Sequence, residues 1–163
     1  CFLDLLKIGY NFELTLIFSE NDIIFKNIKK KFEYDELTNN KIILKNNLNN
    51  EALGLEYKKA DSFIFPSECE TFGIPLIEAA SYSLPVACTN YDVFKEILDE
   101  TGVYFDINDS ESVKSTIVKF YKDKNYLKSK SSSIFEKSKN FSWNKCMKKY
   151  HDYFTKIIDN EKN

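Results

Sequence analysis

The stretch FIFPSECETFGIPLIEAASYSLPVACT, residues 63–89, decides the fold class of this 163-residue chain. It opens with an apolar run that Pro66 ends, and it closes with a second apolar run, VAC. Short uninterrupted apolar runs are typical of strands buried on both faces of a parallel sheet. Between them, Gly73 and Pro75 indicate the start of a helix, and Pro85 follows its end. This order of strand, loop, helix and strand predicts a βαβ unit.

Two carboxylates frame the loop of this unit, Glu70 before the glycine and Glu78 inside the helix. The start of such a helix lies at the carboxyl edge of the sheet, where its free N–H groups favour a phosphate. Carboxylates would repel that phosphate, but they are good acceptors for sugar hydroxyls. The loop therefore suggests a ligand that joins a phosphate to sugars. As a structural alternative, an acidic residue near a helix start stabilises the helix by itself, which would suffice to explain Glu78.

The pair is written ETFGIPLIE and resembles the E-x7-E signature of retaining GT-B glycosyltransferases of family 4, also called group 1. Its flanks resemble the same family. ADSFIFPS, residues 60–67, is similar to the family's AD-x-FV-x-PS, and residues 78–86 are similar to its EAxAxGxPV. The bare pair of glutamates would be a weak signal, but the pair with its strand, Phe-Gly, Pro, Glu-Ala and Pro-Val in order is a specific one.

The resemblance implies a role for each residue of the loop. The second glutamate of the family holds the donor's ribose, the first holds the transferred sugar, and the amides between them meet the diphosphate and sugar. A loop after an earlier strand lies against the nucleotide base. The alternative, which is compatible with that role, is a turn followed by an N-cap at Asn49 or Asn50 for the helix over residues 51–59. The implied catalytic residue is thus Glu70. The implied donor-binding residues are Asn46, Leu48, Thr71, Phe72, Gly73, Ile74 and Glu78.

Three positions depart from the family pattern. Thr71 replaces the usual small residue, and Ser83 stands where a glycine usually ends the helix. Serine adopts a left-handed backbone less readily than glycine, which affects the helix end. Asn46 stands where the family usually has a glycine, in the loop that lies against the nucleotide base (the base loop). Asparagine can take this place because it tolerates positive φ.

Composition excludes several other classes of protein. The chain is 43% hydrophobic with a net charge of −2, which argues against disorder and against a nucleic-acid partner. All 23 basic residues are lysines, so no guanidinium of this chain can clamp a diphosphate. Neither a membrane-spanning apolar run nor a signal peptide occurs in the sequence. We expect a cytoplasmic protein, with any membrane contact at the inner face made through another lobe.

The cysteines and the single histidine do not have the spacing of a metal site. Cys1, Cys69, Cys88 and Cys146 form no C-x-x-C pair, and His151 is far from all but the last. We therefore expect reduced thiols, no metal and no cofactor beyond the nucleotide-diphosphate sugar donor.

The rest of the chain predicts alternating strands and helices. Strands are expected near residues 12–18, 42–45, 63–66, 86–88 and 103–105, and helices near 1–8, 23–32, 51–59, 75–80, 93–98, 110–122 and 124–138. The pattern predicts a doubly wound Rossmann-like parallel α/β sheet with C-terminal helices. A last helix begins at FSW, residues 141–143, with an aromatic stripe that is typical of a core face. In the resembling family it packs towards a partner lobe, so the alternative is that part of the stripe is exposed in this chain.

The resemblance covers only the second lobe of a two-lobed enzyme. We expect residues 1–158 to form this nucleotide-sugar-binding domain and residues 159–163 a frayed tail. The acceptor-binding lobe, the first strand of this lobe and the following arginine and lysine are expected to precede the chain, which would be inactive alone. A stand-alone nucleotide-binding module is the alternative. A dinucleotide-dependent dehydrogenase is disfavoured, because no G-x-G-x-x-G follows a strand.

Overall fold

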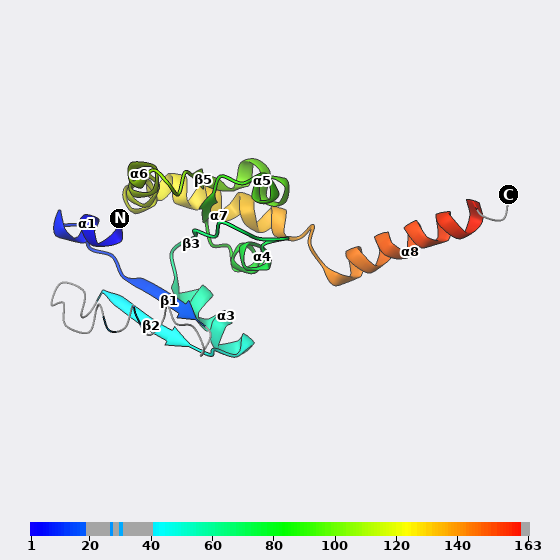
Figure 1. Cartoon of the computed structure of the whole chain (residues 1–163), viewed down its shortest axis with the longest axis horizontal. Coiled ribbons are helices and arrows are strands. Elements are labelled where there is room, and N and C mark those ends of the chain that lie inside the picture. The colour runs from blue at the N-terminus through cyan, green and yellow to red at the C-terminus, as the bar shows by residue number, and fades with distance from the viewer. Residues whose placement is uncertain (19–26, 28–29, 31–40, 161–163) are drawn as a thin grey trace.

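A computed structural model describes residues 1–18, 27, 30 and 41–160. Along these residues the strands and helices alternate as predicted (Figure 1). The elements are α1 (Phe2–Lys7), β1 (Leu14–Phe18), β2 (Ile42–Asn46), α3 (Asn50–Lys59), β3 (Phe63–Phe65), α4 (Ile74–Ser81), β4 (Val86–Thr89), α5 (Asp92–Leu98), the 3-10 turn η1 (Asp99–Thr101), β5 (Val103–Phe105), α6 (Ser110–Lys122), α7 (Lys124–Ser138) and α8 (Trp143–Asn160). The helix expected over 23–32 lies almost wholly outside the described residues.

The strands pair in parallel, which confirms the predicted α/β class. Strand β1 pairs with β2, and β4 lies between β3 and β5. Within the described ranges these are two separate sheets, one of two strands and one of three. Parallel neighbours need crossover connections, and in the three-stranded sheet helices supply them: α4 leads from β3 to β4, and α5 leads from β4 towards β5.

The three-stranded sheet is covered on both faces, as a doubly wound fold requires. Successive residues of β4 point to opposite faces. Val86 and Cys88 join a core with residues of α4, α5 and α7, whereas Ala87 joins Phe105 and Phe120 of α6. All four residues of β4 are buried, which explains its uninterrupted apolar sequence.

Local hydrogen bonds define the start of α3, which precedes β3, and the end of α4, which follows it. The side chain of Asn49 accepts a hydrogen bond of 2.8 Å from the Ala52 N–H, which confirms the predicted N-cap of α3. At the end of α4, Ser83 adopts a left-handed φ of 63° despite its side chain. The Ser131 hydroxyl of α7 donates to the Ser83 carbonyl at 2.7 Å, which holds this turn in place.

Thr89 at the end of β4 provides a test of the core. Its Oγ1 is buried and has no hydrogen-bond partner among the residues that the structure describes. Because an unpaired buried hydroxyl is unfavourable, Thr89→Val is expected to keep or raise the free energy of unfolding, by up to about 1 kcal/mol. Thr116→Val is the control, since the Thr116 hydroxyl donates to the Ser112 carbonyl at 3.0 Å. Urea unfolding of both variants checks this, and a larger loss for Thr89→Val would contradict it.

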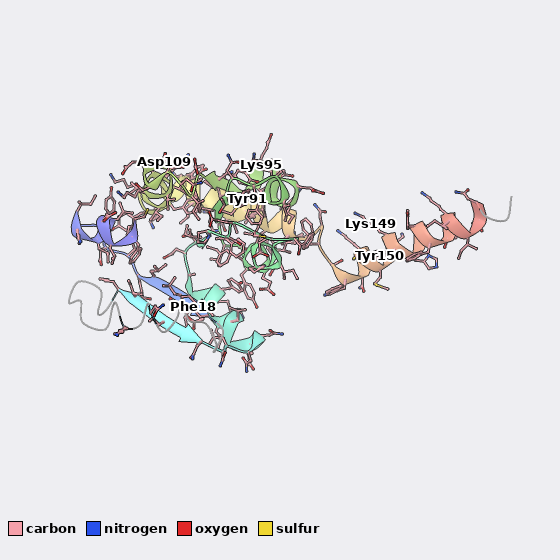
Figure 2. All side chains as sticks on the ribbon, viewed as in Figure 1. Phe18, Tyr91, Lys95, Asp109, Lys149 and Tyr150 are labelled. Carbon is pink, nitrogen blue, oxygen red and sulfur yellow. The ribbon has the colours of Figure 1, made fainter. Side chains whose placement is uncertain are left out.

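Helix α8 departs from the sequence-based expectation of a core face. None of its residues is buried, and its large apolar side chains are exposed, including Trp143 at 82% and Tyr153 at 61%. The helix projects from the rest of the chain, and Tyr150 and Lys149 extend from it without a neighbouring element (Figures 1 and 2). The aromatic stripe is therefore an uncovered amphipathic face. Over the described residues no helix has the length and apolarity needed to cross a membrane.

Candidate functional site

The candidate site begins where β3 ends and α4 starts. Gly73 is the N-cap of α4 and has φ 77° and ψ 49°, the left-handed region. A Cβ added there would lie 3.0 Å from Leu76 Cδ1 and 3.2 Å from Phe94 Cε1. Both the backbone angle and the packing therefore require glycine. Pro75 is the second helical residue, one position later than predicted, because the helix already starts at Ile74.

The first turn of α4, after the carboxyl end of β3, is exposed at Ile74 and buried at Gly73 and Leu76. The Leu76 N–H donates to the Gly73 carbonyl at 3.0 Å, which closes the turn. Ile74 is 58% exposed and Phe72 is 46% exposed. The Phe72 ring meets the edge of Phe141, with ring centroids 6.2 Å apart. The turn is thus an accessible helix start with positive dipole character, the kind of place where a phosphate binds.

Glu70 lies on the exposed part of the loop before this turn. Its Oε1 accepts a hydrogen bond of 3.2 Å from the Ser67 hydroxyl, which also contacts the Cys69 carbonyl at 3.4 Å. Thr71 and Cys69 are exposed as well. One carboxylate oxygen of Glu70 is therefore oriented by the loop itself, and the residue is exposed.

Glu78 lies one turn into α4 and is half-buried. Its Oε2 accepts a hydrogen bond of 3.3 Å from the hydroxyl of Tyr57 on α3. Burial of that phenol, together with the Glu78 carboxylate, raises the pKa of Tyr57, so the hydroxyl stays a donor at neutral pH. Sequence reasoning missed Tyr57. Its position on the inward face of α3 was a signal for packing, and nothing in the sequence pointed from it to Glu78.

The predicted base loop lies on the other sheet. Asn46 ends β2 and Leu48 precedes α3, so neither belongs to the loop between β3 and α4. The positive φ expected at Asn46 falls one residue later, at Asn47 with φ 49°, because Asn46 still pairs in the strand. The Asn47 N–H donates to the Phe18 carbonyl at 3.1 Å, which closes the carboxyl end of β1.

Helix α3 connects the two parts of the candidate site. At its start lies the loop with Asn46 and Leu48, and further along it Tyr57 contacts Glu78 of α4. An ion pair of 2.6 Å between Lys45 of β2 and Glu56 holds the helix against the two-stranded sheet, beside which it lies in Figure 1. The structure thus places Glu70 in the loop before α4, residues 71–74 at the helix start and Glu78 one turn further on. The base loop lies at the opposite end of α3 from Tyr57, which contacts Glu78.

The thiols and carboxylates of the described region do not group as metal ligands. No cluster of three His, Cys, Asp or Glu residues occurs there. Cys88 is buried in β4, and that burial raises the pKa of its thiol to about 12, which makes it unreactive. The expectation that no metal is needed stays a prediction.

Comparisons with known proteins identify the family to which the chain belongs. Residues 25–140 match the sequence model of the family described as "Glycosyl transferases group 1". O-antigen chain mannosyltransferase B of Escherichia coli is 31% identical over 96 residues, which are 59% of this chain and 25% of that protein. The serotype-specific mannosyltransferase WbdA of Escherichia coli is 40% identical over 76 residues, 47% of this chain and 9% of that protein. The chain thus spans a quarter or less of these two relatives.

Solved structures show the same fold. A glycosyltransferase from Rickettsia africae superposes with a TM-score of 0.80 at 20% identity, over 97% of this chain and 43% of that chain. The catalytic domain of starch synthase IV from Arabidopsis thaliana, bound to ADP and acarbose, superposes with a TM-score of 0.72 at 18% identity. The match covers 96% of this chain and 34% of that chain. Both are glycosyltransferases of GT-B architecture. With the family match over residues 25–140, these findings show that the chain belongs to the group 1 glycosyl transferases.

Proposed function

We propose that this chain is the donor-binding lobe of a retaining glycosyltransferase, which transfers a hexose from a nucleotide-diphosphate sugar to a glycan or lipid acceptor. One observation carries the proposal: Glu70 and Glu78 lie on either side of the left-handed Gly73 turn that opens α4. Two acceptor-only carboxylates beside an anion-binding helix start suit a ligand that joins sugars through a diphosphate. The mannosyltransferase relatives make mannose the first hexose to test.

In this proposal the site holds the donor and stabilises its leaving group. The backbone amides of residues 71–74, of which Gly73 is buried and the other three are exposed residues, bind the diphosphate, where negative charge develops as the glycosidic bond breaks. Glu70 binds hydroxyls of the transferred sugar, and Glu78 binds the ribose hydroxyls. Asn46 and Leu48 lie against the base. Neither glutamate needs to transfer a proton, because the gain comes from positioning and from charge stabilisation.

Two features support two further parts of the enzyme, an acceptor-binding lobe and another strand of this lobe. The apolar face of α8 is uncovered, and we propose that the acceptor-binding lobe packs on it. The two parallel sheets are not hydrogen-bonded to each other in the described part, and we propose that a further strand of this lobe lies between them. The chain also covers 43% of the Rickettsia africae glycosyltransferase. The chain alone is then expected to bind donor weakly and to transfer nothing.

A titration with nucleoside diphosphates tests the donor site. The 163-residue chain, labelled with ¹⁵N, is titrated with UDP, ADP and GDP and followed by NMR. We expect saturable binding of at least one, with amide shifts at Thr71, Phe72, Gly73 and Ile74. An absence of saturable shifts with all three would overturn the proposal. If a chain extended by the upstream coding region also binds but transfers no sugar, the alternative of a nucleotide-binding module is favoured.

A further inference from the structure

We propose that Tyr57 is a positioning residue, which orients the Glu78 carboxylate towards the ribose hydroxyls of a nucleoside diphosphate. This inference rests on the proposed function and goes one step further, to a residue on a different helix. Tyr57 lies on α3 and is 8% exposed, whereas Glu78 lies on α4. Its hydroxyl is 3.3 Å from Glu78 Oε2. This is a long hydrogen bond, of the kind that shortens when a ligand completes a site.

The phenol ring is held on two sides, so its hydroxyl has little freedom. Tyr82 stacks on it with ring centroids 5.4 Å apart and an interplanar angle of 25°. The ring of Phe63 of β3 meets the Tyr57 ring edge to face, with ring centroids 5.8 Å apart and an interplanar angle of 73°. Packed aromatic rings of this kind restrict the side chain to one orientation, which directs the hydroxyl at Glu78.

A glycine inside α3 makes room for the stacking ring. Gly54 is buried, and a Cβ added there would lie 2.5 Å from the Tyr82 hydroxyl. Glycine inside a helix costs about 1 kcal/mol relative to alanine. The Tyr82 hydroxyl thus occupies the space that a Cβ at position 54 would fill. Gly54, Tyr82 and Tyr57 therefore form one packed arrangement that ends at Glu78.

The hydrogen bond leaves the carboxylate ready for a vicinal diol. An ionised carboxylate offers about four acceptor sites on its two oxygens. Tyr57 uses one of those on Oε2, which restricts the rotation of the group, and the remaining acceptor sites suffice for the two ribose hydroxyls. A carboxylate that is already oriented loses less rotational freedom when it binds the diol. Tyr57 thus acts on the ligand through Glu78 and does not itself touch it.

Tyr57→Phe is the direct test, because it keeps both ring contacts and removes only the donor. The chain is titrated by NMR with the nucleoside diphosphate that binds best and with its 2′,3′-dideoxy form. We expect Tyr57→Phe to weaken binding of the nucleoside diphosphate about tenfold, as for loss of a hydrogen bond to a charged group. Binding of the dideoxy form is expected to change less than twofold, since Glu78 has no hydroxyl to hold there.

Two further variants separate positioning from packing. Tyr104→Phe is the matched control: the Tyr104 hydroxyl donates to the Asp99 carbonyl at 2.6 Å, and its loss is expected to leave both affinities unchanged. Tyr82→Leu removes the stacked ring at a residue that is 38% exposed, and it is expected to weaken only the binding of the ribose-containing ligand. Equal losses for both ligands, or no loss, would overturn the positioning role. Failure of the unsubstituted chain to bind any nucleoside diphosphate would overturn the proposed function itself.

Discussion

Glu78→Ala is expected to lower the affinity of this chain for nucleoside diphosphates to that of their 2′,3′-dideoxy forms. In the proposed complex the carboxylate accepts hydrogen bonds from two ribose hydroxyls. Each hydrogen bond to a charged group contributes about 1.5–3 kcal/mol, so the loss of both weakens binding roughly 100-fold or more. In the unliganded protein the half-buried Glu78 accepts one long side-chain hydrogen bond, from Tyr57. The free energy of unfolding is therefore expected to fall by only about 1 kcal/mol.

NMR titration and thermal unfolding of the same samples check both parts of this prediction. Glu96→Ala provides the matched control, because Glu96 is an exposed glutamate on α5. It is expected to change neither binding nor unfolding. If Glu78→Ala unfolded the protein, and the unsubstituted chain bound no nucleotide, Glu78 would be a helix-stabilising residue and no more.

Phe94→Ala is expected to cause the largest loss of stability among the variants considered. Phe94 is fully buried in a core that includes residues of α4, β4 and α7. The centroid of its ring lies 5.7 Å from that of the Phe65 ring. It also lies beneath the Gly73 turn, 3.2 Å from where a Cβ of Gly73 would be. Removing a buried phenylalanine typically costs about 3–5 kcal/mol, since the cavity is only partly refilled. The turn would lose its support, so donor binding is expected to fall as well.

Urea unfolding at fixed pH measures the change in free energy. Phe135→Ala on α7 is the control with the same substitution, because Phe135 is 37% exposed. Its expected cost is below about 1 kcal/mol, as for most surface changes. Similar costs for the two variants would show that Phe94 is not part of a tightly packed core.

Much of the fold could be predicted because its signals are local. The apolar runs of β3 and β4, the glycine and proline at the start of α4, and the Asn49 cap of α3 each act within a few residues. Such signals depend on backbone angles and on the nearest hydrogen-bond partners, which the sequence states directly. The turn between Glu70 and Glu78 was predictable for the same reason.

The errors lie where neighbouring residues have similar preferences. Asn46 and Asn47 tolerate positive φ equally well. The positive φ falls on Asn47 because Asn46 is the last residue of β2 that pairs with β1. The stripe on α8 is compatible with a core face or with an uncovered face. Periodicity defines an amphipathic helix but does not say what covers it, and the structure leaves the stripe exposed.

By itself the sequence determined the parallel α/β class, the βαβ unit around residues 63–89 and the two carboxylates of its loop. Only the tertiary structure decided that Tyr57 of α3 contacts Glu78 of α4, that Tyr82 fits over Gly54, and that the described strands form two sheets. The physical reason is distance along the chain. Local conformation follows from each residue and its neighbours, whereas contacts between helices and between strands depend on how all the elements pack at once.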